Sequence, residues 1–143
     1  MHYTAVLKAD GKSIIVHFPA IPQIVSGGAD FDEAVSNAQD ALEVALLTLS
    51  MDNAEPPKDM PAESAEGAVR SIYVSASAVA KIEFMYAFRQ SGLTPAALAG
   101  RIGKTEAEVL RMLKPYHGTK LAMLETAMRA LGKRFVLKVE EAA

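Results

Sequence analysis

Apolar and polar residues alternate near the start of the chain and recur at helical spacing further on. Residues 3–8 and 14–18 both alternate with a period of two, and the intervening Asp10-Gly11 favours a tight turn. The pattern therefore predicts a β-hairpin. Short apolar stretches at 24–26 and 72–74 predict a third and a fourth strand.

A long amphipathic helix is expected between the third and fourth strands. Asp30 and Glu33 have the spacing of a capping box, which marks a helix start. Apolar residues then recur at helical spacing and define the expected buried stripe: Phe31, Val35, Ala38, Leu42, Ala45, Leu46 and Leu49. The stretch 52–67 contains three prolines and predicts a polar connector.

The second half of the chain is predicted to be mainly helical. A helix is expected at about 77–90, with apolar residues on more than one face. Two short helices are expected next, within residues 92–113, followed by a loop. Thr119 is then expected to cap a further helix, which ends at Gly132. Residues 134–140 alternate again and predict a final strand, whose open edge would suit pairing with a second copy of the chain.

Residues 92–113 have the spacing of a DNA-binding helix-turn-helix. Thr94-Pro95 favours a helix start, and Gly103 stands where the turn between two helices requires a positive φ. Leu98, Ile102, Val109 and Met112 form the apolar seam. The outer face of the second helix would carry the residues that read base edges: Thr105, Glu106, Ala107, Leu110 and Arg111. Phosphate contacts are expected from Arg101, Lys104, Lys114 and Lys120. The alternative is an ordinary helical hairpin.

The two halves of the chain carry opposite charge. Residues 89–143 contain ten Lys or Arg and five Asp or Glu, a net +5, whereas residues 1–88 contain five and twelve, a net −7. A basic helix-turn-helix suits a phosphate backbone. DNA would repel the acidic residues 1–88, so this part of the chain is expected to face a basic protein.

Length and composition limit the class of protein. The 143 residues suffice for one domain or two small ones, and an apolar fraction of 50% excludes a largely disordered chain. No apolar run reaches the roughly 18–20 residues that span a bilayer, and no export signal is recognised. Cysteine is absent, so a cytoplasmic location without disulfides is expected.

The sequence does not favour catalysis. The three histidines are too scattered for a metal site, and Asp30, Asp32 and Glu33 are explained as helix-start residues. No glycine-rich phosphate loop is present. We therefore expect no catalytic residue, no metal and no cofactor.

Taken in order, these motifs resemble the HicB-type antitoxins along essentially the whole chain. In the first half the resemblance rests on Phe18-Pro19-Ala20-Ile21-Pro22 and on residues 27–38, which are similar to the family's G-D-T-x-E-E-A-x-x-N-A. In the second half it rests on residues 103–109, 118–121 and 131–134. The chain departs from the family at Gln23-Ile24, where Gly-Cys is frequent, and in the proline-rich connector.

The resemblance implies an α+β fold, in which a reduced ribonuclease H-like β-β-β-α-β domain precedes a helix-turn-helix domain with a terminal strand. Residues 1–75 would bind a small basic HicA-type toxin that cleaves RNA. Residues 92–143 would bind operator DNA and dimerise, and a helix in residues 76–91 would connect the two domains. The toxin would contact exposed acidic residues, including Asp32, Asp40 and Glu43.

Two other interpretations remain open from the sequence. The first is a one-component repressor in which the N-terminal domain senses a small molecule. The second is an oligomerising module without DNA contact, which would leave the basic C-terminal charge unexplained. A short basic reading frame beside the gene would favour the antitoxin. Either a dimer or a higher homo-oligomer is expected, because a helix-turn-helix of this type usually reads two half-sites.

Overall fold

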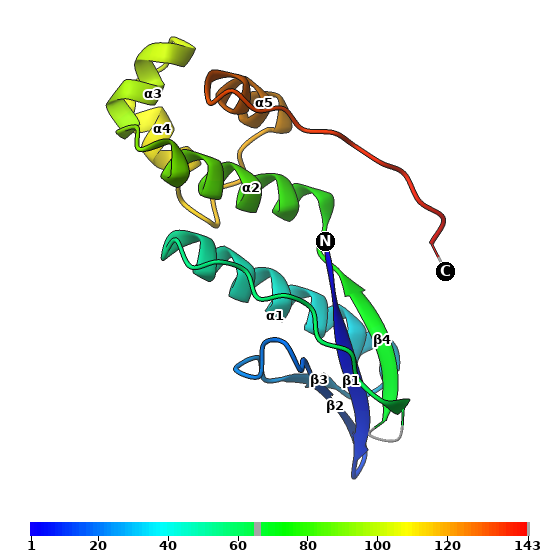
Figure 1. The fold of residues 1–143 in the computed structure, drawn as a ribbon. Coiled ribbons are helices and arrows are strands. Elements are labelled where there is room, and N and C mark those ends of the chain that lie inside the picture. Colours follow the sequence, from blue (N-terminus) through cyan, green and yellow to red (C-terminus); the bar gives the residue numbers. More distant parts are fainter. Residues whose placement is uncertain (65–66, 143) are drawn as a thin grey trace. The chain divides into compact units, whose positions relative to one another are not determined.

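The chain combines an N-terminal antiparallel sheet with a helical C-terminal part (Figure 1), in a computed structural model that describes residues 1–64 and 67–142. It divides into two compact units, Met1–Val79 and Ala80–Ala143, called here the sheet unit and the helical unit. The described elements are β1 (His2–Asp10), β2 (Ser13–His17), β3 (Ser26–Gly28), α1 (Phe31–Met51), β4 (Ala68–Tyr73), α2 (Ala76–Ser91), α3 (Pro95–Ile102), α4 (Glu106–Met112) and α5 (Leu121–Ala130). The expected α+β class and the β-β-β-α-β order are confirmed.

The sheet has the strand order β3-β2-β1-β4, and every pair is antiparallel. Gly11 has φ 61° and closes the predicted hairpin between β1 and β2. Strand β4 returns from α1 and pairs with the other edge of β1, where Ile72 lies opposite Tyr3. Tyr3, Leu7 and Val16 are buried, as alternation predicts for residues that share one sheet face.

Strand β3 lies two residues later than the sequence pattern predicts. The expected strand at 24–26 was wrong because residues 18–24 form two successive turns. In these turns the N–H of Ile21 donates to the carbonyl of Phe18, and that of Ile24 to the carbonyl of Ile21, each at 3.1 Å. The strand pairs through Gly27 and Gly28, where a close backbone approach is needed. A Cβ at Gly27 would lie 2.4 Å from the carbonyl oxygen of Ile14.

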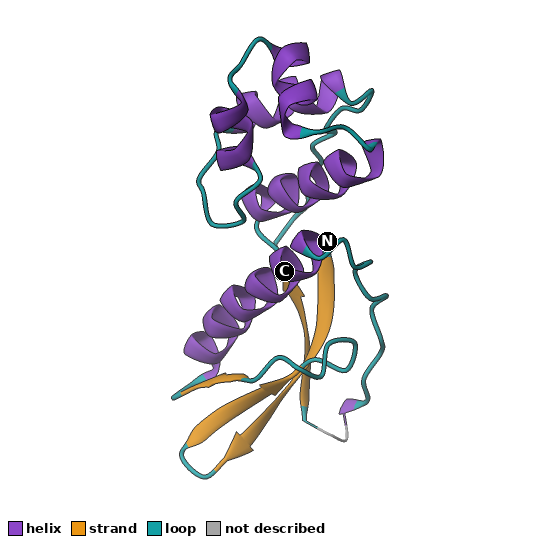
Figure 2. Cartoon of the chain, turned by 90° about the vertical axis from the view of Figure 1, so that its left-hand side faces the viewer, coloured by secondary structure: helices purple, strands orange, loops and turns teal. Residues whose placement is uncertain are grey.

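Helix α1 lies against the sheet (Figure 2) and begins as predicted. The Asp30 carboxylate accepts a hydrogen bond from the N–H of Glu33 at 2.8 Å, and Glu33 accepts one from the N–H of Ala29 at 3.2 Å. The buried residues of the helix are Ala34, Ala38, Leu42, Leu46, Leu47 and Ser50. Phe31 and Val35 were expected in the stripe but are 46% and 37% exposed, because the i, i+4 series that faces the sheet runs through Ala34 and Ala38.

Three side chains of α1 attach the helix to both edges of the sheet. The Asn37 amide donates to the carbonyl of Gly27 at 2.8 Å, beside β3. Gln39 donates to the carbonyl of Tyr73 at 2.8 Å, and Glu43 accepts from the N–H of Ser75 at 2.7 Å, both just at or after the end of β4. These bonds fix the rotation of α1, so the helix presents a defined outer face.

The predicted terminal strand at 134–140 is not formed. After α5, residues 133–142 adopt neither helix nor strand, and Val136, Leu137 and Val139 are 85%, 79% and 89% exposed. A strand needs a neighbour for its backbone N–H and C=O groups, and no strand of the described chain pairs with this segment. The alternating pattern is present, but within the described residues it has no neighbouring strand.

Substituting Gly28 by alanine should destabilise the sheet unit. A Cβ there would lie 2.5 Å from the backbone nitrogen of Ala34, so α1 and β3 would have to separate. We expect the free energy of unfolding to fall by about 1–3 kcal/mol, the usual cost of overpacking. The matched control is Gly100→Ala in α3, where no heavy atom lies within 4 Å and alanine favours the helix. Urea titration of both variants tests this; equal stabilities would contradict it.

Candidate functional site

The turn between α3 and α4 is built by local capping interactions. The Thr94 hydroxyl accepts a hydrogen bond from the N–H of Ala97 at 3.1 Å, and Pro95 opens α3. Gly103 ends α3 with φ 66°, the left-handed conformation that glycine adopts without steric cost. The positive φ predicted at Gly103 is confirmed. Within two residues of this glycine the chain starts α4 in a new direction.

Helix α4 begins with a complete capping box. The Thr105 hydroxyl accepts from the N–H of Glu108 at 3.2 Å, and the Glu108 carboxylate accepts from the N–H of Thr105 at 2.8 Å. These hydrogen bonds hold the pKa of Glu108 below its usual value. The cap orients the first turn of α4, which is the turn that would meet a base edge.

The two helices pack through the predicted seam. Leu98, Val109 and Met112 are buried, and Ile102 is half-buried. Ala99 is 3% exposed and allows α3 and α4 to approach closely. Helix α5 completes the core with Leu124, Ala127 and Met128.

All five residues predicted to read bases are exposed on α4 or its N-cap: Thr105, Glu106, Ala107, Leu110 and Arg111. Leu110 is 46% exposed. The Thr105 hydroxyl is already engaged in the cap, so its methyl group and backbone remain for any ligand. The other four side chains project from the side of α4 opposite Val109 and Met112.

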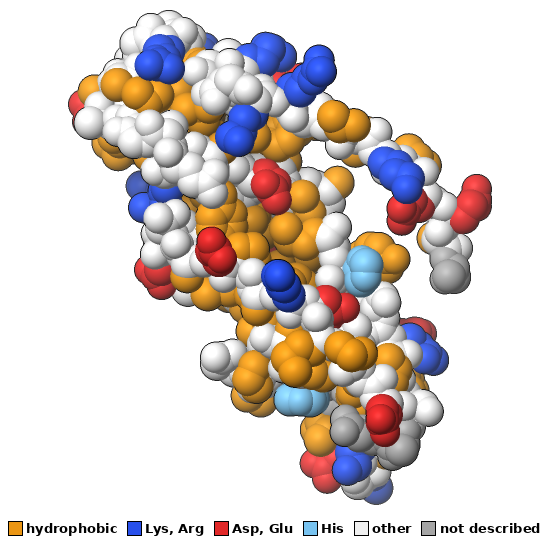
Figure 3. Space-filling view, viewed as in Figure 1, with side chains coloured by type: hydrophobic (Ala, Val, Ile, Leu, Met, Phe, Trp, Pro, Cys, Tyr) orange, Lys and Arg blue, Asp and Glu red, His pale blue; other side chains and the backbone are white. Residues whose placement is uncertain are grey.

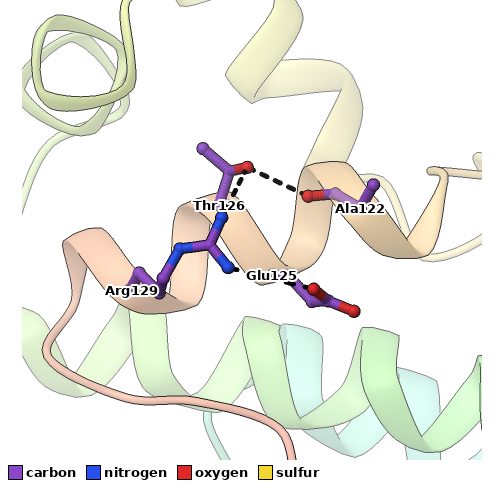
Figure 4. A network of polar contacts seen from close by, with 4 residues as sticks. All are labelled: Ala122, Glu125, Thr126 and Arg129. Atoms are coloured by element: carbon purple, nitrogen blue, oxygen red, sulfur yellow. Dashed lines mark hydrogen bonds and ion pairs between the residues drawn. The ribbon is translucent and has the colours of Figure 1, made fainter.

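The predicted phosphate contacts, Arg101, Lys104, Lys114 and Lys120, are also exposed. Arg101 additionally donates to the carbonyl of Ala130 at 3.3 Å, which links α3 to the end of α5. On the face drawn in Figure 3, Lys and Arg side chains are spread over the helical unit and do not form one stripe. Arg129 is held on α5 by Thr126 at 3.4 Å and Glu125 at 3.9 Å (Figure 4).

A buried lysine that the sequence pattern did not reveal supports α4 from behind. Lys81 of α2 is 5% exposed, and its ammonium donates to the carbonyl of Met112, to the carbonyl of His117 at 3.3 Å and to the Thr119 hydroxyl at 3.1 Å. It thus ties the end of α4 to the loop before α5. Burial lowers the pKa of Lys81 to about 8, so the ammonium form still prevails at neutral pH.

The bonds to Lys81 explain why Thr119 does not cap α5 as predicted. The N-cap of α5 is Lys120, which makes no side-chain capping bond. The Thr119 hydroxyl is instead directed to Lys81 and to the ring Nδ1 of His117 at 3.3 Å. The sequence signal for Lys81 would have been a charged residue inside an otherwise apolar helix, since α2 buries Ile82, Phe84, Met85 and Phe88 around it.

The sheet unit holds the predicted protein-binding residues. Asp32 and Asp40 are exposed on α1, while Glu43 is half-buried and already accepts the hydrogen bond from Ser75. Beside Asp40, a hollow of about 380 Å³ opens between α1 and the loop that precedes β3. Its lining residues are Ile21, Gln23, Ile24, Val25, Asp40, Ala41, Val44 and Ala45.

Residues 1–64 and 67–142 contain no group of three or more His, Asp or Glu side chains placed to hold a metal ion. None of the helices described there combines the length and the apolar character needed to cross a membrane.

The sequence is similar to those of several curated antitoxins. The chain is 35% identical over 123 residues to Antitoxin HicB of Escherichia coli (strain K12), which covers 86% of this chain and 87% of the relative. It is 33% identical over 137 residues to Antitoxin HicB 2 of Photorhabdus laumondii, a match that covers 96% of this chain and 95% of the relative. It is 29% identical over 140 residues to Antitoxin HicB of Pseudomonas fluorescens, which covers 98% of this chain and 94% of the relative. No protein-family model matches the chain. The chain belongs to the HicB antitoxins, as its motifs predict.

Replacing Lys81 by methionine should destabilise the helical unit and change its response to pH. The variant leaves two carbonyls and a hydroxyl without their donor, which costs about 1–3 kcal/mol for each buried group left unsatisfied. The control is Lys120→Met, which removes an exposed lysine from the same unit.

The pH dependence follows from the lowered pKa of Lys81. Between about pH 8 and 10.5 the unfolded chain keeps a proton that the folded chain releases, so the free energy of unfolding rises with pH in this window. Lys81→Met lacks this contribution, so the stability difference between wild type and variant should be larger at pH 10 than at pH 7.5. Urea titrations at both values measure it, and a constant difference would contradict the assignment.

Proposed function

We propose that this chain neutralises a small RNA-cleaving HicA-type toxin and represses its own operon by binding double-stranded operator DNA. The observation that carries the proposal is family membership over most of the chain, combined with the division of charge between the units. In this proposal the protein is a regulator and not an enzyme. Its N-terminal domain is a reduced ribonuclease H-like fold within residues 1–75, joined by residues 76–91 to a helix-turn-helix domain in 92–143.

The DNA half of the proposal is supported by the face of α4. Exposed side chains follow a capped N-terminus and a glycine turn, the arrangement in which a recognition helix enters a major groove. Arg111 has the donors for a guanine edge, and Glu106 is able to accept from a cytosine amino group. Lys104 and Lys114 lie at the two ends of α4, where phosphates would flank the groove.

The toxin half is supported by the acidity of the sheet unit. Residues 1–79 contain four Lys or Arg and eleven Asp or Glu, a net −7. Exposed carboxylates such as Asp32 and Asp40 would attract a basic protein and select its orientation, while apolar contacts determine how long the complex lasts. Glu43 has a structural hydrogen bond to Ser75 and is the weakest of the three candidates.

Assembly is proposed to use the C-terminal segment. Val136, Leu137 and Val139 are exposed, and their segment has the alternation of an unpaired strand, with Phe135, Leu137 and Val139 on one side. Pairing with the same segment of a second copy would bury these residues and satisfy their backbone groups. A symmetric dimer would also place two α4 helices to read two half-sites.

A one-component repressor with a small-molecule sensor is the second candidate. It is favoured by one observation, the hollow in the sheet unit. Binding of the full chain to the toxin encoded by the neighbouring gene separates the two candidates. The antitoxin predicts a stable complex and rescue of growth in cells that express the toxin; the sensor predicts neither.

Arg111→Ala should weaken operator binding and relax sequence preference. We expect a loss of roughly 1–3 kcal/mol on the operator and a smaller loss on random DNA, because a base contact is removed. The matched control is Arg129→Ala, since Arg129 is engaged with Glu125 and Thr126 on α5. Fluorescence anisotropy on both DNAs measures the losses. Equal losses on the two DNAs would show that Arg111 does not read a base.

Removing residues 134–143 should yield monomers with poor operator affinity. The deletion takes away every exposed apolar residue of the C-terminal segment. The control deletion, residues 140–143, leaves the alternating part in place. Light scattering at micromolar concentration reports the assembly. A dimer that persists in the longer deletion would place the interface elsewhere.

A further inference from the structure

The hollow in the sheet unit has one rigid wall from α1 and another from the loop before β3. On α1 it is lined by two pairs at i, i+4 spacing, Asp40 with Val44 and Ala41 with Ala45. This face lies beside the buried stripe, so the small side chains of the alanines leave room against the helix. In Figure 1 the loop between β2 and β3 lies below α1, and both segments line the hollow.

The loop wall is held in place by its own structure. Ile21 and Ile24 are 5% and 8% exposed, and their N–H groups close the two successive turns. Val25 follows these anchors and is 93% exposed, and Val44 on the opposite wall is 47% exposed. Within the described residues the hollow is therefore preformed, apolar inside and bordered by two exposed valines.

The border of the hollow also carries an unneutralised charge. Asp40 is exposed, and no Lys, Arg or His of the described residues forms an ion pair with it. The surrounding sheet unit has a net charge of −7. An apolar depression with a free carboxylate at its edge, in an acidic surface, complements an apolar side chain flanked by a cation.

We propose that this hollow is the central contact for the toxin: an apolar side chain of the toxin fills it, and a neighbouring lysine or arginine of the toxin pairs with Asp40. This inference rests on the proposed function, because it takes the occupant to be the toxin. It identifies Val25, Val44 and Asp40 as specificity-determining residues. Of these, only Asp40 was among the residues expected from the sequence.

The chemistry of the lining favours a protein over a small ligand. Sites for small molecules combine apolar walls with several convergent polar groups that fix orientation. Here six of the eight lining residues are apolar, and only Gln23 and Asp40 offer polar side chains. A shallow apolar site with a charged border instead matches the anatomy of a protein interface, in which a few buried anchors dominate affinity.

Val44→Lys tests the apolar part, with Val35→Lys as a matched control. Both valines lie on α1 and are partly exposed, at 47% and 37%, but only Val44 lines the hollow. Affinity of the full chain for the purified toxin is measured by calorimetry. We expect Val44→Lys to weaken binding by about tenfold or more, as loss of an interface anchor does, and Val35→Lys by less than about twofold.

Asp40→Lys tests the charged border, with Glu55→Lys as its control. Both substitutions change the net charge by the same amount, and both residues are exposed in the sheet unit. If Asp40 pairs with a toxin cation, its substitution should slow association and raise the dissociation rate. Glu55→Lys should only slow association slightly, through the change in net charge. Stopped-flow and surface-plasmon measurements separate the two rates.

Each outcome has one meaning. If wild type does not bind the toxin, the proposed function itself is wrong. A second substitution, Val25→Asp, changes the opposite wall of the hollow. If wild type binds the toxin and both Val44→Lys and Val25→Asp bind it with the wild-type affinity, the antitoxin function stands and the hollow is not the contact. A change of oligomeric state in these variants with toxin affinity retained would assign the hollow to a second copy of the chain. Circular dichroism and urea titration, measured for every variant, show that the fold of the sheet unit is kept.

Discussion

The ammonium group of Lys81 is the interaction on which the geometry of the helical unit depends. It brings together the end of α4, the loop that follows and the threonine before α5. A buried charge is costly unless its donors are satisfied, and here three oxygens surround it. The orientation of α4 is thus fixed at its N-terminus by the Thr105–Glu108 cap and at its C-terminus by Lys81.

This two-ended support has a consequence for recognition. A helix of two turns has few backbone hydrogen bonds of its own, so its direction depends on its ends and its packing. Val109 and Met112 hold one side against α3 and the core, while the cap and Lys81 prevent rotation. In the proposed DNA-binding role, side chains such as Arg111 would project from a well-supported helix, as discrimination between base edges requires.

The sequence predicted the parts of the fold that depend on local chemistry. Thr94, Gly103 and Asp30 act where they were expected, because a cap or a positive φ is set by the nearest few residues. The errors arose where distant partners decide. Thr119 is taken by Lys81, 38 positions away, and β3 is shifted because the turns at 18–24 bury Ile24. The terminal strand was wrong for the single chain because its alternating residues have no neighbouring strand in it. For the candidate site, the sequence periodicity predicted which face of α4 is exposed. It could not predict the hollow, because the hollow forms only when α1 is placed against a loop distant in the sequence.

The separation of the two proposed surfaces has a mechanistic implication. The hollow lies wholly in the sheet unit and the face of α4 wholly in the helical unit, so the two share no residue. In the proposed function, toxin and DNA would not compete for side chains, and the opposite charges of the units would disfavour binding of each ligand to the other surface. In this proposal, assembly is one route that would couple toxin binding to repression, because pairing two copies makes the second half-site contact intramolecular and raises the effective affinity for the operator. A toxin that changed the number of paired chains would alter repression without touching a residue of α4.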